Sequence, residues 1–311
     1  MNHVKGKFIR LFFILVILST LIIPGCSSRS SEAVPPKDRA NEEIINQEPI
    51  NMVNEDIKTE EPIVEPVQIE TIDQIADPPV ENNAQGLSQT LKPSIPILYY
   101  HSIDYEEGNE LRVSPEEFET HMEFLSQNGY ESITLNDLYQ YFYEGKVLPE
   151  KTFVLTFDDG YEDNYAHAFP IAEKYGYSGT IFMVTGWIGG TEYLKEEQLL
   201  EMSRAGWQIE SHTIAHPYLN SLSKEQIKEE LLTSKKILEE MLSEPKIAFA
   251  YPYGVYDSLI IELCRETGYK MGLTTDRGWA GPEDSFRIKR VYCYAQMGLD
   301  EFKRRVENAN Y

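Results

Sequence analysis

The chain has 311 residues, of which 51 are acidic and 28 basic, and its formal net charge is −23 at pH 7. A length of this order holds one large domain or two small ones. So acidic a chain offers no basic face to a phosphate backbone, which excludes the nucleic-acid-binding proteins.

The N-terminal segment has the pattern of an export signal. Residues 11–23 are almost wholly apolar and follow three basic side chains, but they are too few to cross a bilayer, which takes about 20 apolar residues. The run LIIPGCSS at their end resembles the lipobox of bacterial lipoproteins. The resemblance implies a signal peptide over residues 1–25, a lipid on Cys26 and an extracytoplasmic protein anchored to the bacterial cell membrane. A plain signal peptide and an uncleaved anchor are the alternatives.

Residues 26–93 are expected to form a disordered linker. They contain no aromatic residue, eight prolines, and 14 acidic against five basic side chains. A segment of this composition cannot bury enough apolar surface to offset the entropy lost on ordering. Proline and like charge keep such a chain extended, so its expected role is to hold a domain away from a membrane.

The folded domain is expected over residues 94–311. All 20 tyrosines and all three tryptophans lie in this part, which carries 37 acidic against 20 basic side chains. About 215 residues suffice for one domain with a substantial core. Its only cysteines, Cys264 and Cys293, are interpreted as two buried free thiols, with a disulfide between them as the alternative.

Strand-like and helical runs alternate along this domain. Strand-like runs cover residues 96–103, 131–135, 152–157, 179–184, 207–213, 247–254, 270–276 and 287–294. Helical periodicity covers residues 115–128, 136–145, 163–175, 195–205, 223–243 and 257–267. This alternation predicts an α/β fold with parallel strands, either an open sheet or a barrel, and the number of strands favours a small, irregular (β/α) barrel. The chemistry of such barrels lies at the C-terminal ends of the strands.

Polar residues do follow these strands. His101 ends the first, Asp158 and Asp159 end the third, and His212 follows the fifth. Two adjacent carboxylates either form a turn or divide two tasks, with one binding a cation while the other transfers protons. The repeated occurrence of such residues at strand ends favours a chemical role.

His212 and His216 lie four residues apart, directly after a strand. Two imidazoles at this spacing can bind one cation, and a carboxylate would complete the three-ligand set of a catalytic zinc site, which leaves one position for water. A histidine pair alone is often incidental, but the Asp-Asp-Gly strand end upstream favours a metal site. The expected metal is zinc, with cobalt, nickel and iron as alternatives.

Three motifs carry a resemblance to a known family. TFDDG, SHTIAHP and AYPYG, in this order, resemble the first three motifs of the polysaccharide deacetylases, also called the NodB-homology or carbohydrate esterase family 4 domain. The run PILYYHSI is similar to the start of the lipoprotein and biofilm-polymer deacetylase branch. The resemblance covers about residues 95–305 and implies a distorted (β/α) barrel and a metal-dependent hydrolase that acts on acetylated glycans.

The resemblance assigns roles to individual residues. Asp159 would bind the metal together with His212 and His216, and Asp158 would be the general base. The backbone N–H of Tyr253 would help to bind the oxyanion of the tetrahedral intermediate.

The residues on either side of Tyr253 suit that task. Pro252 stiffens the turn, and Gly254 lets the backbone approach a ligand closely. Both are therefore predicted to line the substrate site.

Two supporting groups of the family are missing from their usual places. The third motif usually starts with an arginine that orients the base, and here that position is Ala250. The family often has a late histidine as general acid, but none follows His216. Arg290 is a candidate to pair with Asp158, with a surface charge as the alternative. His101 is a candidate for the same cleft, with a buried histidine bonded to backbone as the alternative.

The remaining aromatic residues allow simpler interpretations. Trp187 and Trp279 flank strand ends and could stack on a sugar face, with core or rim packing as the alternative. Trp207 precedes a strand and is expected in the core. His121 and His167 lie in helical stretches among polar neighbours and are interpreted as surface residues.

The sequence therefore predicts a deacetylase that hydrolyses N-acetyl groups of a cell-surface N-acetylglucosamine polysaccharide. Poly-N-acetylglucosamine is the first choice of substrate, followed by peptidoglycan or a chitooligosaccharide. One alternative is an O-acetyl glycan esterase that uses the same site. Another is a weakly active glycan-binding lipoprotein on the same scaffold. No oligomeric state is predicted.

Overall fold

The structure is a computed structural model and describes residues 93–311. The predicted signal peptide, the predicted lipidation site at Cys26 and the linker as far as residue 92 lie outside the described residues. Within the described range, every helix is either too short or too polar to span a bilayer.

Seven parallel strands close into a barrel. Their order is β1-β8-β7-β6-β5-β4-β3, and β1 pairs with β3 as well as with β8, which closes the ring. The short β2 pairs with the first residues of β3 and lies outside the ring. The predicted (β/α) barrel is thus confirmed. The strands are β1 (Ile97–Tyr100), β2 (Glu131–Ser132), β3 (Thr152–Asp159), β4 (Thr180–Met183), β5 (Gln208–Ser211), β6 (Ala248–Ala250), β7 (Met271–Arg277) and β8 (Ile288–Tyr292).

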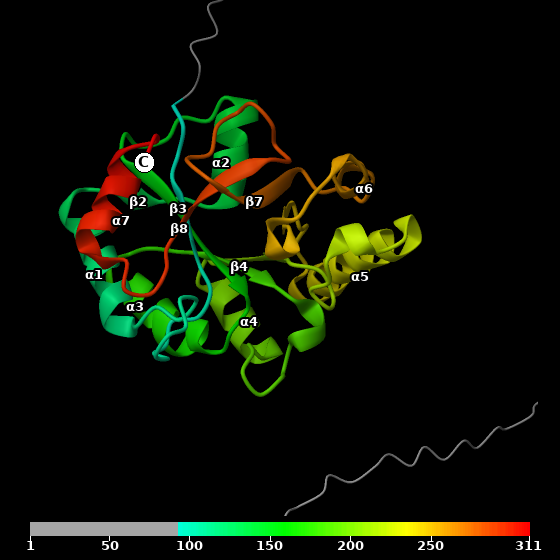
Figure 1. Cartoon of the computed structure of the whole chain (residues 1–311), viewed down its shortest axis with the longest axis horizontal. Coiled ribbons are helices and arrows are strands. Elements are labelled where there is room, and N and C mark those ends of the chain that lie inside the picture. Colours follow the sequence, from blue (N-terminus) through cyan, green and yellow to red (C-terminus); the bar gives the residue numbers. More distant parts are fainter. Residues whose placement is uncertain (1–92) are drawn as a thin grey trace, which may run out of the picture. The chain divides into compact units, whose positions relative to one another are not determined.

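The helices lie around these strands, with α1, α3 and α7 on one side and α5 and α6 on the opposite side (Figure 1). All six predicted helical stretches are present, two of them as an α-helix joined to a π-helical turn. The helices are α1 (Pro115–Gln127), α2 (Leu135–Tyr139) with η1 (Gln140–Glu144), η2 (Asn164–Ala168) with α3 (Phe169–Lys174), η3 (Thr185–Trp187), α4 (Glu196–Arg204), η4 (Leu219–Ser221), α5 (Lys224–Leu242), η5 (Pro252–Gly254), α6 (Ser258–Glu266) and α7 (Gly298–Glu307).

Local sequence explains where the longest helix begins. Ser223 precedes α5, its side chain accepts the N–H of Gln226, and the Gln226 side chain accepts the N–H of Ser223. This reciprocal capping box satisfies backbone donors that a helix start leaves unpaired. The apolar residues of α5 then recur at helical intervals, and four side chains of the helix are buried.

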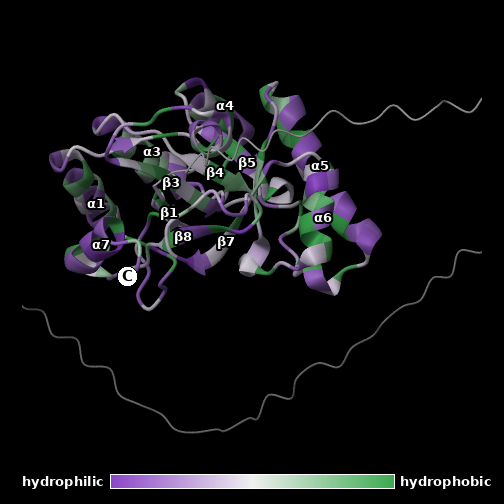
Figure 2. Cartoon of the chain, turned by 90° about the horizontal axis from the view of Figure 1, so that it is seen from above, coloured by the Kyte–Doolittle hydropathy of each residue, from purple (hydrophilic) through white to green (hydrophobic). Residues whose placement is uncertain are grey.

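Alternating side chains of β3 divide the core into two layers. Phe153, Leu155 and Phe157 pack outward in a cluster that includes residues of α1, α3, α4 and α7. Val154 belongs to a second cluster, drawn from β1, β3, β4, β6, β7, β8 and α2, which fills the barrel interior. The helices show alternating hydrophobic and hydrophilic colours, as expected of elements that bury one face (Figure 2).

The predictions for buried residues hold in part. Trp207 lies in the outer cluster, and Cys264 and Cys293 are buried free thiols, as predicted. His121 is fully buried in α1, so its interpretation as a surface residue is wrong. It lies on the inward face of that helix with Phe118 and Leu125, a position that its polar sequence neighbours obscured.

His167 is partly buried, and its Nδ1 donates to the carbonyl of Ile103 at 2.7 Å. This histidine therefore holds the loop after β1 instead of standing free on the surface.

Candidate metal centre

The C-terminal ends of three strands bring the candidate residues together. His101 directly follows β1, Asp158 and Asp159 end β3, and His212 directly follows β5. In a regular strand, adjacent side chains point to opposite faces. Asp159 has a φ of 73°, in the left-handed region, so the regular alternation ends at this residue. Both carboxylates can therefore serve one site.

Asp159, His212 and His216 form a cluster with the geometry of a cation site. The Oδ1 atom of Asp159 lies 3.5 Å from Nε2 of each histidine, and one ligand atom from each residue lies within 4.8 Å of the others. His212 donates from Nδ1 to the carbonyl of Ala250 at 2.7 Å, which leaves Nε2 to carry the lone pair toward the cluster. Two imidazoles and a carboxylate are the donor set of catalytic zinc sites, so these residues fit a divalent cation.

The charges of the cluster favour cation binding. Burial raises the pKa of Asp159, but the hydrogen bond and charge of His212 outweigh it and hold that pKa below its usual value. Burial and the nearby His212 lower the pKa of His216 to about 4. Burial lowers the pKa of His212, yet Asp159 and Asp158 raise it overall. A cation would therefore meet an ionised Asp159 and a neutral His216, and His212 would bind it in its neutral form.

The backbone around the cluster is strained. Four of the six non-glycine residues with positive φ in the described range lie here: Asp159, Thr213, His216 and Tyr253. Such conformations cost about 1–3 kcal/mol each and persist only where the surroundings impose them. Their concentration at one place is typical of a functional site.

Hydrogen bonds hold the loop between the two histidines. The hydroxyl of Thr213 accepts the N–H of His216 at 2.9 Å. Glu230 of α5 accepts the N–H groups of Ile214 and Ala215 at 2.7 and 3.1 Å. No sequence pattern indicates this role for Glu230, because α5 and the loop after β5 meet only in the fold.

Arg290 lies beside the second carboxylate. It is fully buried on β8 and donates two hydrogen bonds of 2.7 Å, one to each carboxylate oxygen of Asp158. Its Nε donates to the carbonyl of Thr274, and its guanidinium lies 4.2 Å from the ring centre of Tyr99. Burial raises the pKa of Asp158, but the charge and hydrogen bonds of Arg290 outweigh it and lower that pKa to about 2. Of the two alternatives for Arg290, the structure shows the pair with Asp158.

His101 lies close to both aspartates. Burial lowers the pKa of its imidazole, and the charges of Asp158 and Asp159 act in the opposite direction. Its Nδ1 atom is enclosed and has no hydrogen-bond partner within residues 93–311, whereas its carbonyl accepts a hydrogen bond from Asn164. The alternative of an imidazole bonded to backbone is thus not found in the described part of the chain.

The turn at residues 252–254 lies beside His216. The rings of Tyr253 and His216 are 4.5 Å apart. Tyr253 and Gly254 have φ values of 58° and 69°. A Cβ atom on Gly254 would lie 1.9 Å from Oγ1 of Thr275, so this position requires glycine for both its φ and its close contact.

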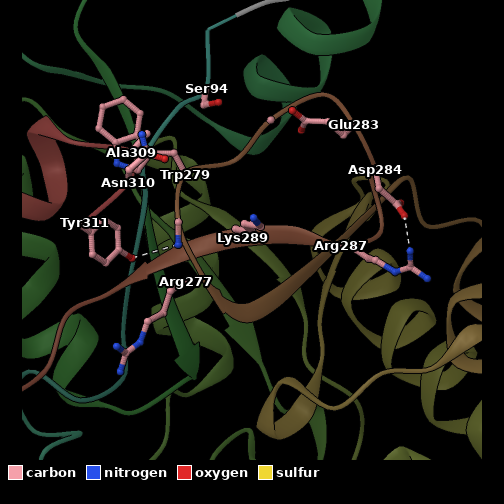
Figure 3. A pocket seen from close by; sticks show the side chains of 12 residues that line it. Ser94, Arg277, Trp279, Glu283, Asp284, Arg287, Lys289, Ala309, Asn310 and Tyr311 are labelled. Carbon is pink, nitrogen blue, oxygen red and sulfur yellow. Dashed lines mark hydrogen bonds and ion pairs between the residues drawn. The ribbon is translucent and has the colours of Figure 1, made fainter.

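The two tryptophans predicted to bind sugar lie in different places. Trp187 follows β4, and its ring lies 5.6 Å from that of His216, at the metal centre. Trp279 donates from its indole nitrogen to the carbonyl of Arg305 and lines a pocket of about 760 Å³ with Ser94 (Figure 3). The next residue, Ala280, pairs with Ile95, which precedes β1. Trp279 therefore lies near the N-terminal end of β1, whereas the cluster lies at the C-terminal ends.

Tyr218 is an aromatic residue of the site that the sequence did not predict. The ring of Tyr218 stacks on that of Tyr253, with 3.9 Å between centroids and 9° between planes. Its place two residues after His216 was the only available signal, since Tyr253 belongs to a distant segment.

Comparison with known proteins identifies the family. The sequence model of the polysaccharide deacetylases matches residues 145–272. YxkH of Bacillus subtilis (strain 168), a protein assigned to the polysaccharide deacetylases, is 34% identical over 302 residues, which cover 96% of this chain and 99% of the relative. The chain belongs to the polysaccharide deacetylase family. The members of this family are metal-dependent hydrolases, which agrees with the donor set of the cluster.

Two further known proteins are similar to this polysaccharide deacetylase. The poly-beta-1,6-N-acetyl-D-glucosamine N-deacetylase of Staphylococcus epidermidis is 28% identical over 194 residues, which cover 58% of this chain and 67% of the relative. Among solved structures, the Streptococcus pyogenes deacetylase PplD in complex with acetate is similar with a TM-score of 0.67 and 28% identity. That match covers 70% of this chain and 99% of PplD.

Proposed function

We propose that this polysaccharide deacetylase hydrolyses N-acetyl groups of a polymer of N-acetylglucosamine. The observation that carries the proposal is the juxtaposition of a cation-binding cluster with a separate carboxylate, Asp158, that Arg290 keeps ionised. A hydrolase of this kind needs a general base beside its metal, and the adjacent positions of Asp158 and Asp159 supply both functions.

Each residue has a distinct task in this proposal. Asp159, His212 and His216 would hold the cation. When bound, a divalent cation lowers the pKa of a water ligand and polarises the acyl carbonyl. Asp158 is placed to accept the proton of the attacking water, because its low pKa keeps it unprotonated at neutral pH.

Two further groups would stabilise charge and move protons. The backbone N–H of Tyr253 would donate to the developing oxyanion, an interaction worth about 3 kcal/mol of activation free energy in other hydrolases. His101 would deliver a proton to the departing nitrogen. That proton would be the one that Asp158 removes from the attacking water, and burial, which lowers the pKa of His101, favours its transfer from the imidazole to the nitrogen as the carbon–nitrogen bond breaks.

The choice of polymer follows from the relatives. The Staphylococcus epidermidis relative is named for poly-beta-1,6-N-acetyl-D-glucosamine, which makes this polymer our first choice. Peptidoglycan and chitooligosaccharides contain the same sugar and come second. We propose zinc as the metal, since two histidines and one aspartate are typical zinc ligands.

The alternative of a binding protein rested on two missing groups. Ala250 replaces the motif arginine, and no histidine follows His216. The guanidinium of Arg290 contacts Asp158 in place of the motif arginine, and the imidazole of His101 lies near both aspartates in place of the late histidine. This geometry favours an active enzyme over the binding protein.

We also propose that the enzyme works outside the cytoplasm on a lipid anchor. The support is the basic and apolar start of the chain, the LIIPGCSS run at Cys26 and the acidic, proline-rich segment after it. Radiolabelled palmitate incorporated into the full chain, and lost in Cys26→Ser, would support the anchor; equal labelling of both chains would contradict it.

The function is tested by acetate release from the full-length protein, stripped of metal by a chelator and then supplied with Zn²⁺ or Co²⁺. The substrates are poly-beta-1,6-N-acetylglucosamine oligomers and chitooligosaccharides of equal length, with acetylated xylan as the O-acetyl substrate. Asp158→Asn removes the proposed base with little change in shape. Asp300→Asn, at an exposed position of α7, is the matched control.

Metal-dependent release from the N-acetyl substrates would support the proposal if Asp158→Asn loses about 10²–10⁴-fold in rate while the control keeps it. Release from acetylated xylan alone would establish the esterase instead. Tight metal binding without release from any of the glycans would leave the binding protein.

A further inference from the structure

Two stacked tyrosine rings stand half exposed beside the metal centre. Tyr218 is 52% exposed and Tyr253 is 51% exposed. Their rings lie 3.9 Å apart and almost parallel, so each limits the motion of the other. A rigid aromatic surface loses little conformational entropy when a ligand covers it, which makes such a surface well suited to binding.

The backbone on both sides of the stack is fixed. Leu219, next to Tyr218, is fully buried, and the carbonyl of Tyr218 accepts hydrogen bonds from the N–H and the hydroxyl of Ser221. Tyr253 is held at positive φ by a turn whose Gly254 leaves no room for a side chain. The position of the stack is therefore set by the fold before any ligand binds.

The stacked pair is part of a longer series of neighbouring aromatic rings, which includes the imidazole of the proposed metal ligand His216. The ring of Tyr253 is 4.5 Å from that of His216, which is 5.6 Å from that of Trp187. The ring of Trp187 in turn lies 4.7 Å from that of Tyr193. Tyr218 ends this series of ring contacts on one side, so a chain of sugars that has one unit at the cation cluster and extends along the series would reach it.

The phenol groups of the stack are available to a ligand. Within residues 93–311, neither the hydroxyl of Tyr218 nor that of Tyr253 has a hydrogen-bond partner. An exposed aromatic ring offers an apolar face to the C–H groups of a pyranose, and its hydroxyl can bond to the sugar hydroxyls. The chemistry of the stack thus matches a sugar ring.

We propose that Tyr218, supported by Tyr253, forms a subsite for the sugar next to the unit that is deacetylated. The inference rests on the proposed function, because it takes the cluster of Asp159, His212 and His216 as the place of reaction. It makes Tyr218 a specificity-determining residue that selects oligosaccharides and polymers over monosaccharides. The ligand class is a chain of β-linked hexosamine units.

The test compares variants of the full-length, Zn²⁺-supplied protein on N-acetylglucosamine and on its tetrasaccharide. Tyr218→Ala is expected to raise the KM for the tetrasaccharide about tenfold, the effect of losing one aromatic contact of about 1.4 kcal/mol. The KM for the monosaccharide should rise by a smaller factor. Tyr218→Phe keeps the ring and should restore most of the affinity. Tyr143→Ala, at an exposed tyrosine in η1 that leads into the N-terminal end of β3, is the matched control.

The subsite would be overturned if Tyr218→Ala left the KM for the tetrasaccharide unchanged. It would also be overturned if Tyr218→Ala raised the KM for the tetrasaccharide and for the monosaccharide by the same factor. Calorimetric titration of the tetrasaccharide separates this outcome from a failure of the proposed function. If the wild type releases no acetate from N-acetyl glycans, the proposed function fails. Weaker binding of the tetrasaccharide by Tyr218→Ala would still support the subsite, whereas equal or absent binding would overturn it.

Discussion

Arg290 and Asp158 are separated by 132 residues in the sequence and are joined by two hydrogen bonds of 2.7 Å each. Both side chains are buried, and the two-pronged contact is the strongest form of the arginine–carboxylate interaction. Removal of one partner from such a pair leaves an uncompensated buried charge, at a cost of about 3–5 kcal/mol. The pair therefore fixes both the position and the ionised state of the proposed base.

Arg290→Lys tests this relationship, because lysine keeps the charge but cannot contact both oxygens. We expect kcat to fall by about 10²-fold, within the range attributed to general-base catalysis. The pKa of Asp158 is held low by Arg290, so a weaker partner raises it, and the acidic limb of the rate profile moves to higher pH. The measurement is kcat/KM for acetate release as a function of pH.

The control for this variant is Arg287→Lys. Arg287 is exposed, just before the same strand, and pairs with Asp284. Arg287→Lys should leave the dependence of kcat/KM on pH unchanged. A profile of Arg290→Lys that coincides with that of the wild type would show that the pair does not set the state of the base.

If Asp159, His212 and His216 bind the metal, replacing one of them should weaken metal binding. His216→Asn removes one ligand, while asparagine tolerates the positive φ at this position. We expect the affinity for Zn²⁺ to fall by more than the factor of about 10–100 that is typical of outer-shell changes. Metal content after dialysis against Zn²⁺ buffers measures the effect. His167→Asn, at a histidine outside the cluster, should bind as much zinc as the wild type, and equal zinc in both variants would contradict the site.

Much of this architecture could be predicted from local sequence. Alternating strand and helix patterns predicted the barrel, because each run has the period of its own element. The motifs that contain Asp158, Asp159, His212 and His216 predicted a cluster, because parallel strands place their C-terminal ends at one end of the barrel.

Features set by distant contacts were harder to predict. In α7, only Leu299, Phe302 and Val306 carry the helical spacing among charged residues, so the helix was not expected. His121 is buried because Tyr100 and Phe302 surround it, and neither is near it in sequence.

Gly254 provides a prediction about the turn that carries Tyr253. Gly254→Ala would place a Cβ atom 1.9 Å from Oγ1 of Thr275, at a φ of 69°. Gly145→Ala is the matched control, since Gly145 has a φ of 85° but nothing within 4 Å of such an atom. We expect both to destabilise the fold through φ, by about 1 kcal/mol, and Gly254→Ala to cost at least about 1–3 kcal/mol more because of the clash. Urea unfolding measures the difference, and equal losses would mean that Thr275 moves aside freely.

His121 gives the stability of the domain a dependence on pH. Its ring is buried, stacks on Phe302 at 4.0 Å and lies 3.0 Å from the hydroxyl of Tyr100. Burial lowers its pKa from 6.5 to about 3. Between these values the unfolded chain binds a proton that the folded protein does not bind. This residue therefore makes the free energy of unfolding decrease as the pH falls from about 6.5 toward 3, by up to about 1.4 kcal/mol per pH unit.

The measurement is urea unfolding at about pH 7.5 and about pH 5, compared between Tyr100→Phe and the double variant Tyr100→Phe with His121→Phe. The Tyr100→Phe background removes the hydroxyl that would otherwise lose its hydrogen-bond partner, and phenylalanine at position 121 keeps the stack on Phe302. The other histidines titrate in both proteins, so the difference in pH dependence belongs to His121. We expect the double variant to lose about 1–2 kcal/mol less than Tyr100→Phe between the two pH values. Identical losses would show that His121 is protonated without cost in the folded protein, so that its burial does not govern its titration.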